Sequence, residues 1–197
     1  MFASRIVLIG VLLLPSLACA GVINLDFEGL ADGTILTNQY VGFLFTNAII
    51  ETAGLSLNDL EFPPRSGTNV VADDGGLMTI EFASPVLTFS GFFTYSSPLT
   101  IDAFDALNQS VGTTNSAFSA NYVSSGNPPN ELLQVSFAGG ISGVSITGNL
   151  AGSSFALDDV TITTPVSGPE PSSGFMVAGS LVLVCLLGRA RGRVPIK

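Results

Sequence analysis

Residues 69–82 read Asn-Val-Val-Ala-Asp-Asp-Gly-Gly-Leu-Met-Thr-Ile-Glu-Phe, two short apolar runs around an Asp-Asp-Gly-Gly sequence. Asp and Gly adopt turn conformations readily, so Asp73 and Asp74 are assigned to a turn that joins two strands as a hairpin. Residues 23–28 alternate apolar and polar side chains, which is typical of a strand with one buried face. Both patterns predict β-structure.

Runs rich in Val, Ile, Thr and Phe recur on both sides of this stretch and are separated by Gly, Asn, Asp, Ser and Pro. No window between residues 21 and 168 keeps a convincing helical period. About nine or ten strands at this spacing predict an all-β fold, a single β-sandwich or jelly roll. The expected strands are residues 23–28, 41–46, 69–71, 77–82, 86–95, 99–104, 117–123, 132–137, 143–147 and 154–163.

Composition excludes several classes of function. The chain has 197 residues, of which none is His or Trp and two are Cys. Without His there is no Ser-His-Asp triad, no Cys-His dyad and no His-ligated zinc site. Residues 21–168 hold fourteen acidic residues and one basic residue, Arg65, for a net charge of −13. We expect no nucleic-acid partner, because neutralising phosphates requires Lys and Arg.

The N-terminus has the features of a secretory signal peptide. Arg5 precedes an apolar run over residues 6–14, and Ala18 and Ala20 fit the small-residue cleavage pattern. We predict a signal peptide over residues 1–20, used by the export machinery and cut by signal peptidase after Ala20. One Cys lies in this segment and the other in the C-terminal apolar run, so the exported part has no disulfide.

A second apolar run, residues 174–188, lies near the C-terminus and is about 22 Å long as a helix. The basic residues Arg189, Arg191 and Arg193 follow it in the tail 189–197. A bilayer core is roughly 30 Å thick, and arginines that reach toward the lipid surface close part of the difference. Clustered arginines favour the cytoplasmic side. We predict a transmembrane helix with a cytoplasmic tail.

Pro169, Glu170 and Pro171 lie in a linker rich in Pro, Ser and Gly, residues 164–173, between the β domain (residues 21–163) and the predicted helix. A Pro-Glu-Pro motif, an apolar helix and an Arg-rich end, in this order, resemble a PEP-CTERM sorting tail. The resemblance implies an exosortase-type membrane protease as partner and transient anchoring in the inner membrane of a Gram-negative bacterium. It further implies release to the cell envelope or the extracellular matrix, often with exopolysaccharide and biofilm. An ordinary membrane anchor is the alternative.

The candidate metal ligands are Asp26, Glu28, Asp158 and Asp159. Asp26 and Glu28 share one face of the first predicted strand, and Asp158 and Asp159 lie in the last. A β-bulge at Asp158-Asp159 would let the flanking apolar residues both face inward. If the terminal strands pair, the carboxylates converge, and a calcium ion would relieve their repulsion.

This arrangement also resembles jelly-roll domains of the carbohydrate-binding and concanavalin-like kind. In those domains an acidic residue near the first strand and a final Leu-Asp-Asp-Val strand often frame a structural calcium. The resemblance implies the same cofactor here. The alternative is that all four acidic side chains face solvent.

Three functions remain open for residues 21–163. The first is a non-enzymatic structural or adhesive β-sandwich, which needs no concave site. The second is a carbohydrate-binding module for exopolysaccharide, with Tyr95 and Tyr122 at a ligand rim. The third is a hydrolase with two facing carboxylates, one of them desolvated. The phenylalanines, including Phe89 and Phe92, are expected in the core. We predict a protein that is not an enzyme.

Overall fold

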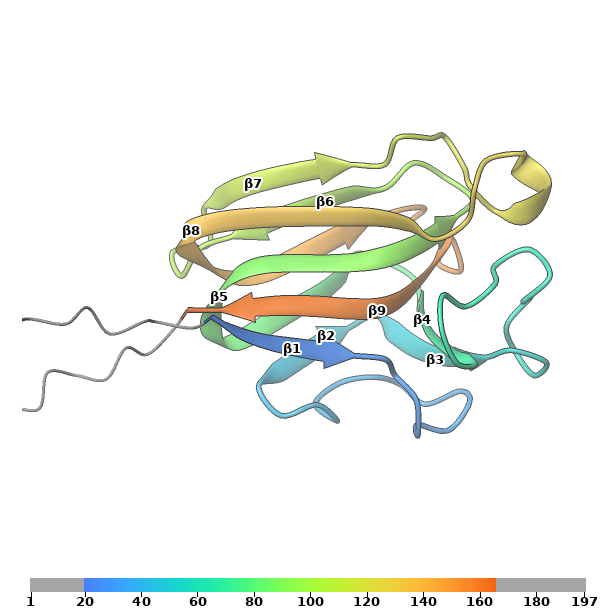
Figure 1. Ribbon diagram of the computed structural model, residues 1–197, viewed down its shortest axis with the longest axis horizontal. Coiled ribbons are helices and arrows are strands. Elements are labelled where there is room, and N and C mark those ends of the chain that lie inside the picture. The colour runs from blue at the N-terminus through green and yellow to red at the C-terminus, as the bar shows by residue number, and fades with distance from the viewer. Residues whose placement is uncertain (1–19, 166–197) are drawn as a thin grey trace, which may run out of the picture. The chain divides into compact units, whose positions relative to one another are not determined.

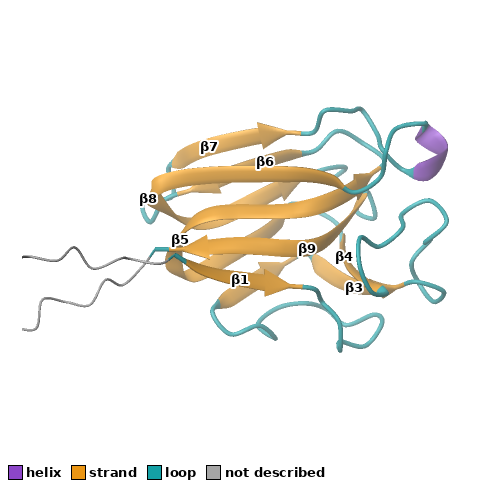
Figure 2. Ribbon diagram, in the orientation of Figure 1, coloured by secondary structure: helices purple, strands orange, loops and turns teal. Residues whose placement is uncertain are grey.

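Nine strands and one short 3₁₀ helix make up residues 20–165, the part of the chain that the computed structural model describes (Figure 1; Figure 2). The all-β prediction is confirmed. The elements are β1 (Gly21–Leu25), β2 (Phe43–Thr46), β3 (Ala48–Thr52), β4 (Asn69–Asp73), β5 (Met78–Tyr95), β6 (Thr100–Phe104), β7 (Ser110–Asn115), η1 (Val123–Ser125), β8 (Glu131–Thr147) and β9 (Phe155–Thr164).

Several predicted features lie outside the described residues: the signal segment up to residue 19, the motif at 169–171, the apolar run 174–188 and the arginines after it. Within residues 20–165, no helix has the length and apolar character needed to cross a membrane.

Two long strands, β5 and β8, run through both layers of the sandwich. The first part of β5 (residues 78–82) pairs with β2 on one side and with the end of β8 on the other. The end of β8 also pairs with β6, and β6 pairs with β7. We call this the β6 layer. The later part of β5 (residues 88–95) pairs with β9 and with the start of β8. We call this the β9 layer; in it β1 and β4 pair with β9, and β3 with β4.

Both long strands bend at one place. In β5 the pairing register shifts between Glu81 and Val86, around Pro85, which has no N–H to donate. In β8 Gly140 has φ +96°, and a Cβ there would lie 2.9 Å from Cβ of Pro85. The sequence predicts two separate strands for each of β5 and β8. In the structure the halves are continuous, because the bends redirect the chain without ending either strand.

The Asp-Asp-Gly-Gly turn is present, but the predicted hairpin is wrong. Gly75 and Gly76 have positive φ values of 82° and 78°. The strands that flank them do not pair with each other, because β4 lies in the β9 layer and the start of β5 in the β6 layer. Asp73 accepts hydrogen bonds from the backbone N–H groups of Ser154 (2.6 Å) and Phe155 (3.0 Å). The turn therefore carries the chain from one layer to the other, and Asp73 joins β4 to the start of β9.

The predicted strand at residues 117–123 is also wrong, and β3 and β7 were not predicted. The side chain of Asn121, which has no exposed surface, accepts a hydrogen bond from the backbone N–H of Tyr95 (2.6 Å) and donates one to the carbonyl oxygen of Phe93 (2.9 Å). Side-chain hydrogen bonds thus hold this segment against β5 in place of a strand ladder.

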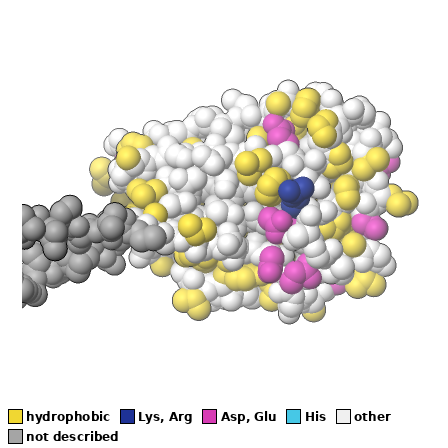
Figure 3. Space-filling view, viewed as in Figure 1, with side chains coloured by type: hydrophobic (Ala, Val, Ile, Leu, Met, Phe, Trp, Pro, Cys, Tyr) yellow, Lys and Arg dark blue, Asp and Glu magenta, His cyan; other side chains and the backbone are white. Residues whose placement is uncertain are grey.

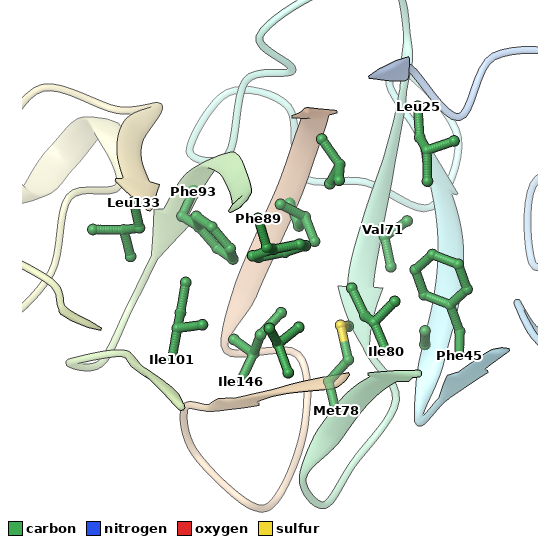
Figure 4. Close-up of a cluster of buried hydrophobic side chains, with 14 of the residues drawn as sticks. Leu25, Phe45, Val71, Met78, Ile80, Phe89, Phe93, Ile101, Leu133 and Ile146 are labelled. Carbon is green, nitrogen blue, oxygen red and sulfur yellow. The ribbon is translucent and has the colours of Figure 1, made fainter. Parts of the chain in front are cut away.

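The core lies between the two layers, and both contribute to it (Figure 4). Strands such as β2 and β6 direct alternate apolar side chains inward, as the two-residue period requires, whereas all five residues of β4 are buried. Burying one such side chain contributes about 1.5–3 kcal/mol of transfer free energy. The labelled members of the cluster are Leu25, Phe45, Val71, Met78, Ile80, Phe89, Phe93, Ile101, Leu133 and Ile146.

Phe89 offers a test of this core. Its side chain has no exposed surface, and its ring centroid lies 6.4 Å from that of Phe82. We expect Phe89→Ala to lower the free energy of unfolding by about 3–5 kcal/mol, because the cavity cannot fully collapse. Urea unfolding measures this loss. Leu132→Ala is the control, since Leu132 is 54% exposed and should change stability by less than about 1 kcal/mol. Equal effects of the two variants would contradict the assigned core.

Candidate functional site

The first and last strands pair, so the four predicted calcium ligands lie in one region. Leu25 of β1 is opposite Val160 of β9, and Asp26 follows directly on Leu25. The register between β5 and β9 shifts next to Asp158 and Asp159, and Asp159 has φ +46°. This is the anticipated bulge. It turns the apolar residues on both sides inward, since Leu157 and Val160 have no exposed surface.

These carboxylates hold the loop that enters β4. Glu28 Oε1 accepts the backbone N–H groups of Thr68 (2.7 Å) and Asn69 (2.8 Å). Asp158 Oδ2 accepts those of Arg65 (2.7 Å) and Ser66 (2.9 Å). Asp159 Oδ1 accepts the Ser66 hydroxyl at 2.8 Å, and Asp26 Oδ1 accepts the Glu28 N–H at 3.2 Å. Three of the four acidic side chains therefore bind residues 65–69 directly.

The donor arrangement fits a loop clamp better than a metal site. Within residues 20–165, no group of three or more Asp, Glu, His or Cys side chains is placed to hold a metal ion. The oxygens that calcium would need already accept N–H and O–H groups, namely those of Glu28, Asp158 and Asp159. The calcium site stays a prediction.

Burial dominates the ionisation of Asp158. Its side chain is 1% exposed, and this desolvation raises its pKa from 3.8 to about 6. The backbone N–H groups of Ser66, Asp159 and Arg65 oppose the rise, because they favour the charged form. For Glu28, at the surface, the backbone hydrogen bond from Asn69 is the main influence and lowers the pKa.

The two predicted rim tyrosines differ in exposure. Tyr95 has no exposed surface, and its hydroxyl donates to the carboxylate of Glu131. It cannot form a rim, because its alternation in β5 directs it inward. Tyr122 is partly buried and stacks on Phe62, with ring centroids 6.1 Å apart and planes at 20°. One face of the Tyr122 ring is therefore occupied.

A groove of about 640 Å³ lies on the outer surface of the β6 layer. Across three neighbouring strands, Glu81 of β5 is opposite Gly143 of β8, and Gly143 is opposite Phe104 of β6. Two strand spacings place the backbones of Glu81 and Phe104 about 10 Å apart, with no side chain between them. A Cβ at Gly143 would lie 3.2 Å from the carbonyl oxygen of Ile80. Glycine therefore opens a slot with a carboxylate on one side and an aromatic ring on the other.

Ser145 provides a hydroxyl in this groove. It is opposite Thr79 of β5 and Asp102 of β6, and it points outward because its neighbours Val144 and Ile146 face the core. Ser145 is 6% exposed and lines the groove. Within residues 20–165, its hydroxyl has no hydrogen-bond partner. The Ser145 hydroxyl is thus accessible from the groove and has no protein partner among the described residues.

The turn between β6 and β7 closes one end of the groove with Asp105 and Asn108. Asp105 Oδ1 accepts the backbone N–H groups of Leu107 (2.9 Å) and Gln109 (2.9 Å). These bonds fix the turn and orient the carboxylate, as Asp side chains commonly do in turns. The turn that contributes Asp105 to the groove is therefore held in place by its own hydrogen bonds, without a ligand.

Sequence reasoning missed Phe104 by assigning the phenylalanines to the core. The buried residues of β6 are Ile101 and Ala103, so Phe104 lies on the opposite face, with Thr100 and Asp102. Strict alternation over residues 100–104 was the signal that could have found it.

Phe92 is also an outward ring, on the β9 layer. The Arg65 guanidinium lies 4.6 Å from its ring centroid, a cation–π contact. Arg65 is the one basic residue within residues 20–165. Figure 3 shows a single spot of basic side-chain atoms on this face, with acidic and hydrophobic side chains around it.

Comparison with known proteins finds no matching family model and no matching curated protein. Solved structures with some likeness include a mutant of a family 29 carbohydrate-binding module, with a TM-score of 0.42 and 12% identity over 78% of this chain and 99% of that one. The cleaved adhesin domain of Lys-gingipain from Porphyromonas gingivalis gives a TM-score of 0.37 and 14% identity over 75% and 99%.

A family 11 carbohydrate-binding module from Clostridium thermocellum, in complex with a mixed-linked tetrasaccharide, gives a TM-score of 0.34 and 11% identity over 76% and 99%. These TM-scores are all below 0.5. The site described above rests on the structure itself.

The raised pKa of Asp158 predicts a pH dependence of stability. The folded state holds the proton more tightly than the unfolded chain, so this contribution is fully present below about pH 4 and is lost as pH rises through about 6. The loss is on the order of 3 kcal/mol. We expect Asp158→Asn to flatten the free energy of unfolding between about pH 4 and 7, measured by urea titration at each pH. An unchanged slope would refute this role.

Proposed function

We propose that this protein is an exported, non-catalytic module that binds a polysaccharide chain in the groove of the β6 layer. The observation that carries the proposal is the slot over Gly143, with Glu81 and Phe104 on its two sides. Sugar rings present apolar C–H faces and polar hydroxyl edges. Phe104 offers an apolar face, and Glu81 and Ser145 offer hydrogen-bonding groups for the hydroxyls.

The groove favours a binding module over a purely structural one. A structural β-sandwich has no need of a concave outer face. Here Phe104 is partly buried, yet it is not among the side chains of residues 20–165 that pack against the core cluster. Its ring lines the groove, which is where an apolar platform for a ligand would have to lie.

A hydrolase is the weaker alternative. Paired-carboxylate hydrolysis needs an acid with a raised pKa facing a second carboxylate across one cleft. Burial raises the pKa of Glu51 and of Asp158. Neither Glu51 nor Asp158 lines the groove. Glu51 lines a second hollow within residues 20–165, between the loop after β3 and the start of β9, and Asp158 does not. The two carboxyl groups whose pKa is raised therefore lie outside the groove.

The sequence at the two ends of the chain supports the proposed location. The signal-peptide pattern and the Pro-Glu-Pro tail favour delivery to the envelope or matrix, and the PEP-CTERM resemblance implies exopolysaccharide there. On this proposal the terminal segments determine the location of the module, and the groove determines what it binds.

Phe104→Ala tests the groove. We expect the purified protein to bind at least one neutral hexasaccharide from a set of cello-, manno-, xylo- and N-acetylglucosamine hexamers in isothermal titration. The Ala variant should bind it at least tenfold more weakly, a loss of about 1.4 kcal/mol. Phe92→Ala removes the same ring from the outer face of the β9 layer and should leave the affinity unchanged. Failure of every hexamer to bind, or loss in the Phe92 variant alone, would contradict the proposed site.

A further inference from the structure

The charged side chains that line the groove are both negative. Glu81 is exposed, and its side chain has no hydrogen-bond partner within residues 20–165. Asp105 uses Oδ1 for the turn, and no group of the described residues donates to its Oδ2. Both residues line the groove, and no basic residue does. The two carboxylates therefore remain available to a ligand.

The rest of the domain adds to the negative potential at the groove. Residues 21–168 carry a net charge of −13, and Arg65 lies over Phe92 on the other layer. A potential of one sign lowers the local concentration of ligands with the same charge and raises that of ligands with the opposite charge. Uronic-acid polymers would therefore be repelled from the groove, and cationic ligands would be attracted.

Ser145 independently indicates that a polar ligand completes the groove. The residue is 6% exposed and lines the groove, and its hydroxyl oxygen, which stays accessible to solvent, has no protein partner within residues 20–165. A solvated hydroxyl in such a groove can exchange its bound water for a hydroxyl group of a ligand. A ligand with hydroxyl groups would supply this bond.

The opposite wall suits a positive charge as well. The Phe104 ring stands across the slot from Glu81. An aromatic face attracts an ammonium group through its quadrupole, and a carboxylate binds an ammonium group by a charge-assisted hydrogen bond. The two walls thus favour the same chemical group.

If the groove binds polysaccharide, as proposed above, we propose further that it selects amine-bearing glycans, such as polymers of glucosamine, over neutral and acidic ones. A protonated sugar amine lies between Glu81 and Phe104, above Gly143. A ring hydroxyl of the same chain pairs with Ser145. Asp105, at the closed end, attracts the amine of a neighbouring sugar residue.

The test compares two hexamers that differ only in the group at the sugar nitrogen, a protonated amine in one and a neutral acetamide in the other. Glucosamine hexamer and N-acetylglucosamine hexamer are titrated into the purified protein at about pH 6, where a free amine is protonated. We expect the glucosamine hexamer to bind at least tenfold more tightly. Glu81→Gln should lower its affinity about fivefold or more and lower that of the acetylated hexamer by a clearly smaller factor, because Gln keeps a hydrogen-bonding oxygen but loses the charge.

Asp59→Asn is the matched control. It removes one carboxylate from the loop before β4, outside the groove, and so changes the net charge equally. Equal losses in Glu81→Gln and Asp59→Asn would overturn the proposal, because they would indicate attraction to overall charge only. Equal affinity for the two hexamers, with binding still lost in Phe104→Ala, would overturn the amine preference and leave polysaccharide binding intact. If neither hexamer nor any neutral hexamer binds, both proposals fail.

Discussion

The continuity of β5 and β8 through both layers is the constraint on which the rest of the structure depends. Each strand gives one half to each layer, so the core residues of the two layers are positioned by the same pieces of chain. The bends at Pro85 and Gly140 lie against each other and set the geometry of that crossing. The groove follows from it, because Glu81 and Gly143 belong to the halves of β5 and β8 in the β6 layer.

Carboxylates, two of them buried and one at the surface, join segments that are distant in the chain, as disulfides do in other small domains. Asp73 connects β4 to the start of β9, Glu28 holds the loop before β4, and Asp158 holds the same loop from the β9 bulge. Each accepts two or more backbone N–H groups, which would otherwise lack partners in irregular chain. The cost is desolvation, visible in the raised pKa of Asp158. A domain without cysteines and with one basic residue thus uses its many acids as hydrogen-bond acceptors.

Local patterns located most strands and failed where the partner is distant. Alternation placed β2, β6 and β9 close to their observed bounds, and the Asp-Asp-Gly-Gly turn is real. The turn's flanking strands nevertheless pair elsewhere, because a turn signal reports a change of direction and carries no information about the partner. The groove could not be predicted for the same reason, since local sequence does not say which strands become neighbours. Nothing local to Phe104 places it beside Gly143, which is 39 positions away along the chain and directly opposite in the sheet.

The sequence by itself determined the all-β class, the acidic character and the exclusion of His-dependent chemistry, since these depend on composition and on a two-residue period. It also located the acidic residues near the first and last strands of the β domain, which pair in the structure. Only the tertiary structure decided which layer each strand joins, which residues lie beside Phe104, and that Glu28 and Asp158 bind a loop. The reason is that strand register and layer are set by contacts between residues far apart in the chain, and a shift of one residue exchanges the buried and exposed faces.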